Sequence, residues 1–246
     1  MKYLIRFITA SILMLTTASP VLAQLDEIIV TGTRVNNDNN PGVFLEKRGD
    51  FLLLEARLIN DTRDARLRKR EMNKTFDKIL EAAKANTDIQ LSIVDDNGIV
   101  GPLTKDVFGA NVSFGPRADT SQATILLKTE IPDNVTSAFG LLTKLESFVD
   151  EIKGDGRSEF QATDDTSISV INPNQYRHDV IKLIVSEVNL ITNSLNGDYG
   201  AKIKGINQEL QWARSGELNL AFFIPYSYDI IPSTLNSLTI INAEDF

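Results

Sequence analysis

Apolar and polar residues alternate along some stretches of the chain and recur at helical spacing along others. Residues 51–60 predict a strand that is buried at its start and alternates later. Residues 67–85 place apolar side chains on one helical face, and residues 89–94 alternate again before the turn sequence at 95–98. The first unit is therefore predicted to be strand, helix, strand.

The same order recurs further along the chain, after a segment at 98–122 that is rich in glycine and proline and predicts a hairpin or irregular connection. A strand predicted at 158–171 should break near Asp164 and Asp165. The elements predicted after residue 122 are strands at 123–131, 158–171, 201–212 and 217–230 and helices at 135–152 and 176–195.

This repeated order predicts an α+β fold: a largely antiparallel sheet with helices packed on one face, built from two strand-helix-strand units and a C-terminal hairpin. We expect one globular domain over 44–232, which could divide into subunits at 44–98 and 123–232. Residues 233–246 are predicted to be a tail.

The first 23 residues have the features of a secretory signal peptide. Lys2 and Arg6 precede a mostly apolar run, and Val21-Leu22-Ala23 supplies small residues at a cleavage site. The apolar run is shorter than the roughly 20 residues that a membrane-spanning helix needs. We therefore expect an exported mature chain that begins at Gln24, lies in the periplasm and has no membrane span.

Composition narrows the function classes. Removing residues 1–23 takes away two basic and no acidic side chains, so 23 basic and 33 acidic groups remain, a net charge of −10. Generic nucleic-acid binding needs an excess of Lys and Arg, so we expect no nucleic-acid partner. The chain has no cysteine, which excludes disulfides, cysteine nucleophiles and thiolate metal sites.

The segment Asp26-Glu27-Ile28-Ile29-Val30-Thr31-Gly32-Thr33-Arg34 lies just after the expected cleavage site. It resembles the TonB-box region of TonB-dependent outer-membrane receptors. In that family the segment is a flexible periplasmic peptide that adds as a strand to the C-terminal domain of TonB. The resemblance implies that the partner-binding residues are Asp26, Glu27, Ile28, Ile29, Val30 and Thr31.

The residues themselves suit that role, because β-branched side chains favour an extended backbone that can pair with a sheet edge. Residues 24–43 would then be a flexible peptide and linker. The resemblance covers about a dozen residues, and 246 residues cannot hold a whole receptor, whose membrane strands alone would take about 220. The same β-branched run also predicts an ordinary first strand of the domain.

Over residues 51–230 the order of elements is similar to that of SIMPL-domain proteins of the bacterial envelope. The likeness is one of topology. Members of that family are mostly non-enzymatic and some form oligomers, so the resemblance implies a binding or scaffolding role and allows a homo-oligomer.

Four other features could carry chemistry, and each has a simpler structural interpretation. His178, the only histidine, is expected on a helix surface. The pairs Asp95-Asp96 and Asp164-Asp165 could act as acid and base or bind calcium, but adjacent residues of an extended chain point opposite ways, and turns explain them. The other two features are a basic cluster, expected on a solvated helix face, and aromatic residues of the final hairpin, expected mainly in the core. These are Arg63, Arg66, Arg68, Lys69, Arg70 and Lys74, and Trp212, Phe222, Phe223, Tyr226 and Tyr228.

We therefore predict a non-enzymatic periplasmic binding or adaptor protein that engages TonB through its N-terminal peptide and serves nutrient uptake or envelope assembly. Any association with the outer membrane would come through that partner. No catalytic residue, cofactor or metal is expected. Two alternatives are a structural oligomer of the SIMPL-like type and a hydrolase that uses acidic residues, for which Asp95, Asp164 and Asp165 would have to converge.

Overall fold

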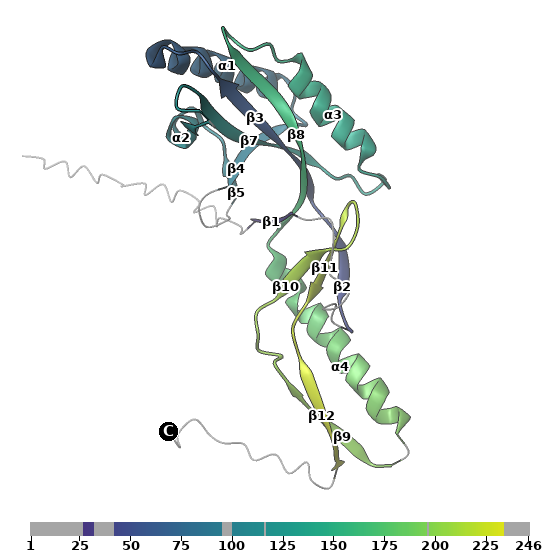
Figure 1. The fold of residues 1–246 in the computed structure, drawn as a ribbon. Helices are drawn as coiled ribbons and strands as arrows, with labels where there is room; N and C mark the ends of the chain where they lie inside the picture. The colour runs from purple at the N-terminus through teal and green to yellow at the C-terminus, as the bar shows by residue number, and fades with distance from the viewer. Residues whose placement is uncertain (1–26, 32–41, 95–99, 116, 196, 234–246) are drawn as a thin grey trace, which may run out of the picture.

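The computed structural model describes residues 27–31, 42–94, 100–115, 117–195 and 197–233. The signal peptide predicted at 1–23 lies outside these ranges, as does the predicted tail except Ser233. The described part is an elongated α+β molecule (Figure 1), which confirms the predicted fold class. None of its helices is long and apolar enough to cross a membrane.

The main sheet has seven strands, and all of its pairs are antiparallel. Its order is β1-β8-β3-β7-β4-β5, with β6 paired to β7. The bounds are β1 (Glu27–Thr31), β3 (Phe51–Asn60), β4 (Gln90–Val94), β5 (Val100–Pro102), β6 (Ser113–Phe114), β7 (Ser121–Glu130) and β8 (Ser158–Ile171). The strands predicted at 51–60 and 158–171 are confirmed with the same bounds.

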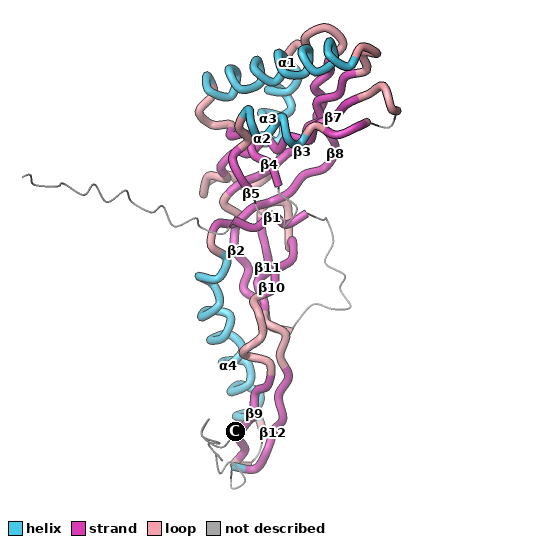
Figure 2. The backbone as a smooth tube through the Cα atoms, turned by 90° about the vertical axis from the view of Figure 1, so that its left-hand side faces the viewer, coloured by secondary structure: helices cyan, strands magenta, loops and turns pink. Residues whose placement is uncertain are grey.

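Helices α1 (Ala65–Ala85), α2 (Lys105–Asn111) and α3 (Phe139–Glu151) pack on one face of this sheet. Their apolar side chains form the first core with alternate residues of β3 and β7, such as Leu58 and Ile125. The ring of Phe76 on α1 stacks on that of Phe108 on α2, with 3.9 Å between centroids. Figure 2 shows these helices gathered at one end of the molecule.

The other end is built on α4 (Arg177–Ser194), which a short 3₁₀ helix, η2 (Pro173–Tyr176), precedes. Two small antiparallel sheets lie beside it, one in the order β10-β11-β2 and one that pairs β12 with β9. Their strands are β2 (Leu45–Arg48), β9 (Tyr199–Lys204), β10 (Gln211–Arg214), β11 (Asn219–Phe223) and β12 (Ser227–Pro232). Apolar residues of α4 and β11 form a second core here, which includes Val180, Ile184, Leu220 and Phe222.

Strands β3 and β8 contribute to both cores. On β3, Leu52 belongs to the second core and Leu58 to the first; on β8, Ile168 belongs to the second and Phe160 to the first. Both of the sequence ranges considered as subunits, 44–98 and 123–232, therefore supply residues to each core.

Three elements differ from the sequence prediction. Helix α3 begins at Phe139 and not near residue 135, because the Glu217 carboxylate accepts hydrogen bonds from the Ala138 amide (3.1 Å) and the Ser137 hydroxyl (3.2 Å). Helix α2 forms inside the predicted irregular segment, where the Thr104 hydroxyl caps it by accepting from the Val107 amide.

The arms of the predicted C-terminal hairpin are the third difference, since each arm divides into two strands. Gly205 has φ +85°, in the left-handed region, and a Cβ there would lie 2.7 Å from the Pro225 carbonyl oxygen. The turn at Gly205 thus ends β9, and Pro225 separates β11 from β12 on the opposing arm.

Candidate functional site

Strand β1 lies at one edge of the main sheet and pairs antiparallel with β8, with Ile28 opposite Val170 and Val30 opposite Ile168. The Val30 side chain is buried in the second core, and Ile28 packs against that core. Because side chains alternate along a strand, one face of β1 packs on the second core.

The main chain of β1 has a defined inner and outer side. The Ser169 carbonyl accepts from the Asp50 amide, and the Ile171 amide donates to the Asp50 carboxylate, so these two residues of β8 face β3. Because main-chain groups alternate along a strand, Ile168 and Val170 face β1. Their partners Val30 and Ile28 hydrogen-bond inward, and Ile29 directs its N–H and C=O to the outer edge. No further strand pairs with that edge among the described residues.

The other face of β1 is held by a buried ion pair between strands that are far apart in the sheet. The Glu27 carboxylate lies 2.5 and 2.6 Å from the Lys128 ammonium of β7 and accepts from the Ser169 hydroxyl at 2.5 Å. The two charged side chains are only 13% and 6% exposed. The ammonium also lies 3.9 Å from the ring centroid of Phe51, which is a cation–π distance.

The structure thus places five of the six predicted partner-binding residues, Glu27 to Thr31, in an edge strand; Asp26 lies outside the described residues. Of the two interpretations of this segment, the first strand of the domain is the one that the structure has. The prediction that it binds TonB stays a prediction. Residues 32–41 of the predicted linker are also outside the described part.

The acidic pairs do not form a described site. Asp95 and Asp96 lie outside the described residues. Asp164 and Asp165 are exposed in a bulge of β8, where three residues stand opposite Glu55 between two registers. The predicted break in this strand is therefore a bulge within one continuous strand. Among the described residues there is no cluster of three metal-binding side chains.

His178 is exposed as the second residue of α4, as the helical pattern predicts. The aromatic residues of the final strands divide between core and surface. Phe222 is fully buried, whereas Tyr226 and Tyr228 are half-buried with ring centroids 6.4 Å apart. Trp212 is half-buried against the second core.

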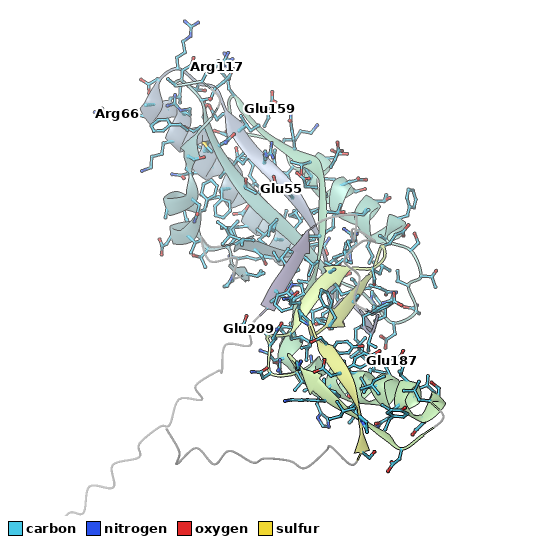
Figure 3. All side chains as sticks on the ribbon, turned by 60° about the horizontal axis from the view of Figure 1, so that its bottom comes forward. Glu55, Arg66, Arg117, Glu159, Glu187 and Glu209 are labelled. Atoms are coloured by element: carbon cyan, nitrogen blue, oxygen red, sulfur yellow. The ribbon has the colours of Figure 1, made fainter. Side chains whose placement is uncertain are left out.

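The basic cluster is only partly a solvated face. Arg63, Arg66, Lys69, Arg70 and Lys74 are exposed, but Arg68 is 7% exposed. Figure 3 shows Arg66 and Arg117 at one end of the molecule, with Glu187 and Glu209 toward the other. The basic cluster therefore marks one end of the molecule.

The structure contains a second buried carboxylate, which the sequence pattern does not predict. Glu71 of α1 is 8% exposed, and its Oε2 accepts from the Asn60 side-chain Nδ2 (2.9 Å) and the Thr62 hydroxyl (2.6 Å). These hydrogen bonds, Asn60 first and then Thr62, hold the pKa of the Glu71 carboxyl below its ordinary value of 4.5. Both donors belong to β3 or to the residues just after it, so we infer that Glu71 has a structural role and connects α1 to the sheet. A basic run around it in the sequence concealed its burial.

No protein-family model matches the chain, and no curated protein matches it.

Proposed function

We propose that this chain is a non-enzymatic binding or adaptor protein of the periplasm, which recognises its partner by strand addition to the outer edge of β1. The observation that supports the proposal is the position of Glu27 to Thr31 at the end of the main sheet, with the main chain of Ile29 directed outward. An edge of this kind offers a row of main-chain donors and acceptors to an incoming strand.

The contacts of β1 favour addition to the edge over release of the strand. Releasing β1 would expose Val30, which is 7% exposed, and would leave the Lys128 ammonium without its carboxylate. Both changes cost free energy, since an unpaired buried charge is strongly unfavourable. A partner strand that pairs with the outer edge leaves both contacts in place.

The candidate partner is the C-terminal domain of TonB, because residues 26–34 resemble the segment that this domain binds in outer-membrane receptors. The chain would then be an accessory in nutrient uptake or envelope assembly. The contact would be short, because in a five-residue strand only alternate residues direct their main-chain groups outward.

The variant Ile29→Pro tests this proposal. Proline removes the outward N–H of residue 29, while the hydrogen bonds of Ile28 and Val30 to β8 remain. We expect binding of the TonB C-terminal domain to weaken by at least about tenfold. The measurement is a titration of the isotope-labelled mature protein, followed by NMR through the amides of β1.

The matched control is Ile29→Ala, which shortens the same side chain but keeps the N–H, and it should bind like the wild type. Amide exchange of Ile28 and Val30 in the proline variant checks that β1 is still paired with β8. Wild-type affinity in the proline variant, or TonB-induced shifts confined to residues remote from β1, would contradict the proposal.

The same unpaired edge also favours the structural oligomer as a second candidate. Two copies of β1 could pair with each other across a two-fold axis, which would bury both outer edges. Light scattering on the wild type and on Ile29→Pro separates the two functions. A dimer that the proline variant converts to a monomer would indicate self-assembly, and a monomer in both would leave the edge available to a partner.

A further inference from the structure

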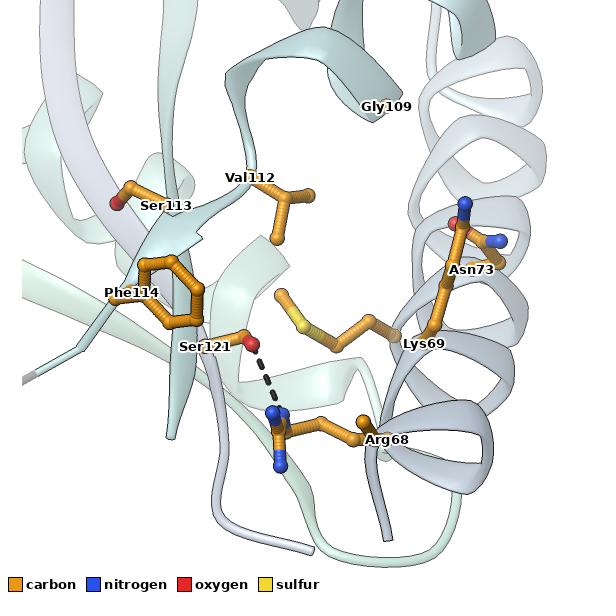
Figure 4. Close-up of a pocket in the computed structure, with 10 residues that line it drawn as sticks. Arg68, Lys69, Asn73, Gly109, Val112, Ser113, Phe114 and Ser121 are labelled. Carbon is orange, nitrogen blue, oxygen red and sulfur yellow. Dashed lines mark hydrogen bonds between the residues drawn. The ribbon is translucent and has the colours of Figure 1, made fainter. Parts of the chain in front are cut away.

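A hollow of about 290 Å³ lies between the N-terminal half of α1, the end of α2 and strand β6. Figure 4 shows the side chains around it, which come from α1, from residues 112–114 and from Ser121 at the start of β7. Its volume is at the lower end of the range of about 300 to 1,000 Å³ that is typical of small-molecule sites, so it would fit only a small ligand. Its lining includes Arg68, Lys69, Met72, Val112, Phe114 and Ser121.

Arg68 brings a buried positive charge to this hollow. Its guanidinium donates to the Ser121 hydroxyl (2.9 Å) and to the carbonyl oxygens of Thr62 (2.6 Å) and Asp119 (3.0 Å). All three acceptors are neutral, and among the described residues no carboxylate forms an ion pair with Arg68. A charge that is 93% buried without a counterion is costly, and an anion in the hollow would offset that cost.

The surroundings strengthen the positive potential. Lys69 also lines the hollow, and Arg66 and Arg70 extend from the same turns of α1. None of these three forms an ion pair within the described part of the chain. Of the acidic groups nearby, Asp61 and Asp119 pair with Arg117 and Arg157. The Glu71 carboxylate accepts from Asn60, Thr62 and the Arg157 amide. The N-terminus of α1 itself is capped by Asp64, whose carboxylate accepts from the Leu67 amide at 2.7 Å, so the positive potential comes from the basic side chains.

The rest of the lining is apolar. Met72 is buried, and Val112 is half-buried. Phe114 is 79% exposed, more than any other large apolar side chain among the described residues. Covering an exposed aromatic ring with an apolar group is favourable, because apolar surface is removed from water.

We propose that this hollow binds a small organic anion with a short aliphatic or aromatic body. The acidic group binds Arg68 and Lys69, because charge-assisted hydrogen bonds to an anion neutralise both cations. The body lies against Met72, Val112 and Phe114. Such an anion can come from solution or from a lipid that exposes its acidic head group, and the two sources share the same chemistry at this site.

Octanoate is the probe, titrated into the isotope-labelled mature protein at concentrations below micelle formation. We expect shifts at the amides of Val112, Phe114 and Ser121. Octanol, which has the same chain and no charge, should bind at least about tenfold more weakly. Inorganic phosphate, which has the charge and no apolar body, should also bind at least about tenfold more weakly.

Two surface variants locate the site without disturbing the fold. Lys69→Ala and Phe114→Ala should each weaken octanoate binding, by about tenfold and about fivefold respectively. Lys84→Ala, in the last turn of the same helix, is the matched control and should leave the affinity unchanged. Binding to vesicles that contain a fatty acid is measured for the wild type and for Lys69→Ala. Vesicle binding that the variant loses indicates a membrane source, and no vesicle binding by the wild type indicates a soluble one.

The inference is overturned if octanoate produces no shifts at these amides, if octanol or phosphate binds as tightly as octanoate, or if the Lys84 variant loses as much affinity as the Lys69 variant. None of these outcomes depends on TonB or on β1, so this site and the proposed strand addition are tested separately.

Discussion

The Glu71 carboxylate is surrounded by hydrogen-bond donors that the sequence does not predict. Asn60, Thr62 and the Arg157 amide all donate to its Oε2. Gly156 permits this close approach: its φ is +60°, and a Cβ there would lie 2.2 Å from the Glu71 Cδ. The carboxylate therefore ties α1 to β3 and to the turn that precedes β8.

This tie makes stability depend on pH. Because the pKa of Glu71 is lower in the folded state than its ordinary value of 4.5, the ionised form stabilises the fold above that pH. The stabilisation is lost as the pH falls through the folded-state pKa. We expect the free energy of unfolding, measured with urea, to fall less in Glu71→Gln than in the wild type between about pH 5 and about pH 3.

The matched control is Glu81→Gln, which removes an exposed carboxylate from the same helix and should reproduce the wild-type pH dependence. If Glu71→Gln and the wild type lose equal stability on acidification, the pKa of Glu71 is the same in the folded and unfolded states, and the prediction is wrong.

At the scale of one element, β1 is attached by unlike contacts on its two faces. Val30 is buried in an apolar core, while Glu27 pairs with Lys128 across the sheet. Removing the carboxylate leaves the ammonium buried and unpaired, and detachment of β1 would then let water reach it. The ion pair therefore controls how firmly the strand stays in the sheet.

We expect Glu27→Gln to reduce the amide-exchange protection of Ile28 and Val30 by at least about tenfold. The double variant Glu27→Leu with Lys128→Met replaces both charges by apolar groups and should restore most of the protection, because it leaves no unpaired charge. Protection unchanged in Glu27→Gln would show that the apolar face alone holds β1.

The whole molecule has two cores that share the long strands β3 and β8. Leu58 lies in the first core, and Trp212, the only tryptophan, packs against the second. Because the same strands cross both cores, loss of packing in one should destabilise the other. The two ends of the molecule are therefore expected to unfold as one unit.

Leu58→Ala tests this coupling, since it creates a cavity in the first core and should cost about 2 to 5 kcal/mol. We expect the unfolding transition seen by Trp212 fluorescence to shift together with that seen by circular dichroism. Leu190→Ala makes the same chemical change at a residue that is 67% exposed and should shift neither transition. A Trp212 transition that stays in place while circular dichroism becomes biphasic would show independent cores.

Local patterns in the sequence are sufficient to predict several elements of the fold. The periodicity of residues 51–60, 158–171 and 67–85 predicts β3, β8 and α1 closely, because each carries its own apolar face. It also marked residues 27–31 as extended, since β-branched side chains favour that backbone. The α+β class followed from the order of these elements.

Other features depend on contacts between groups that are distant in the chain. Glu217 sets where α3 begins, although 79 residues separate it from Ala138. Lys128 and Arg68 look like ordinary surface cations in the sequence, yet folding buries the first beside Glu27 and the second beside a hollow. Burial and pairing arise from contacts between strands and helices that the local pattern does not contain. The ion pair that fixes β1 and the hollow beside the basic cluster therefore form only in the folded chain.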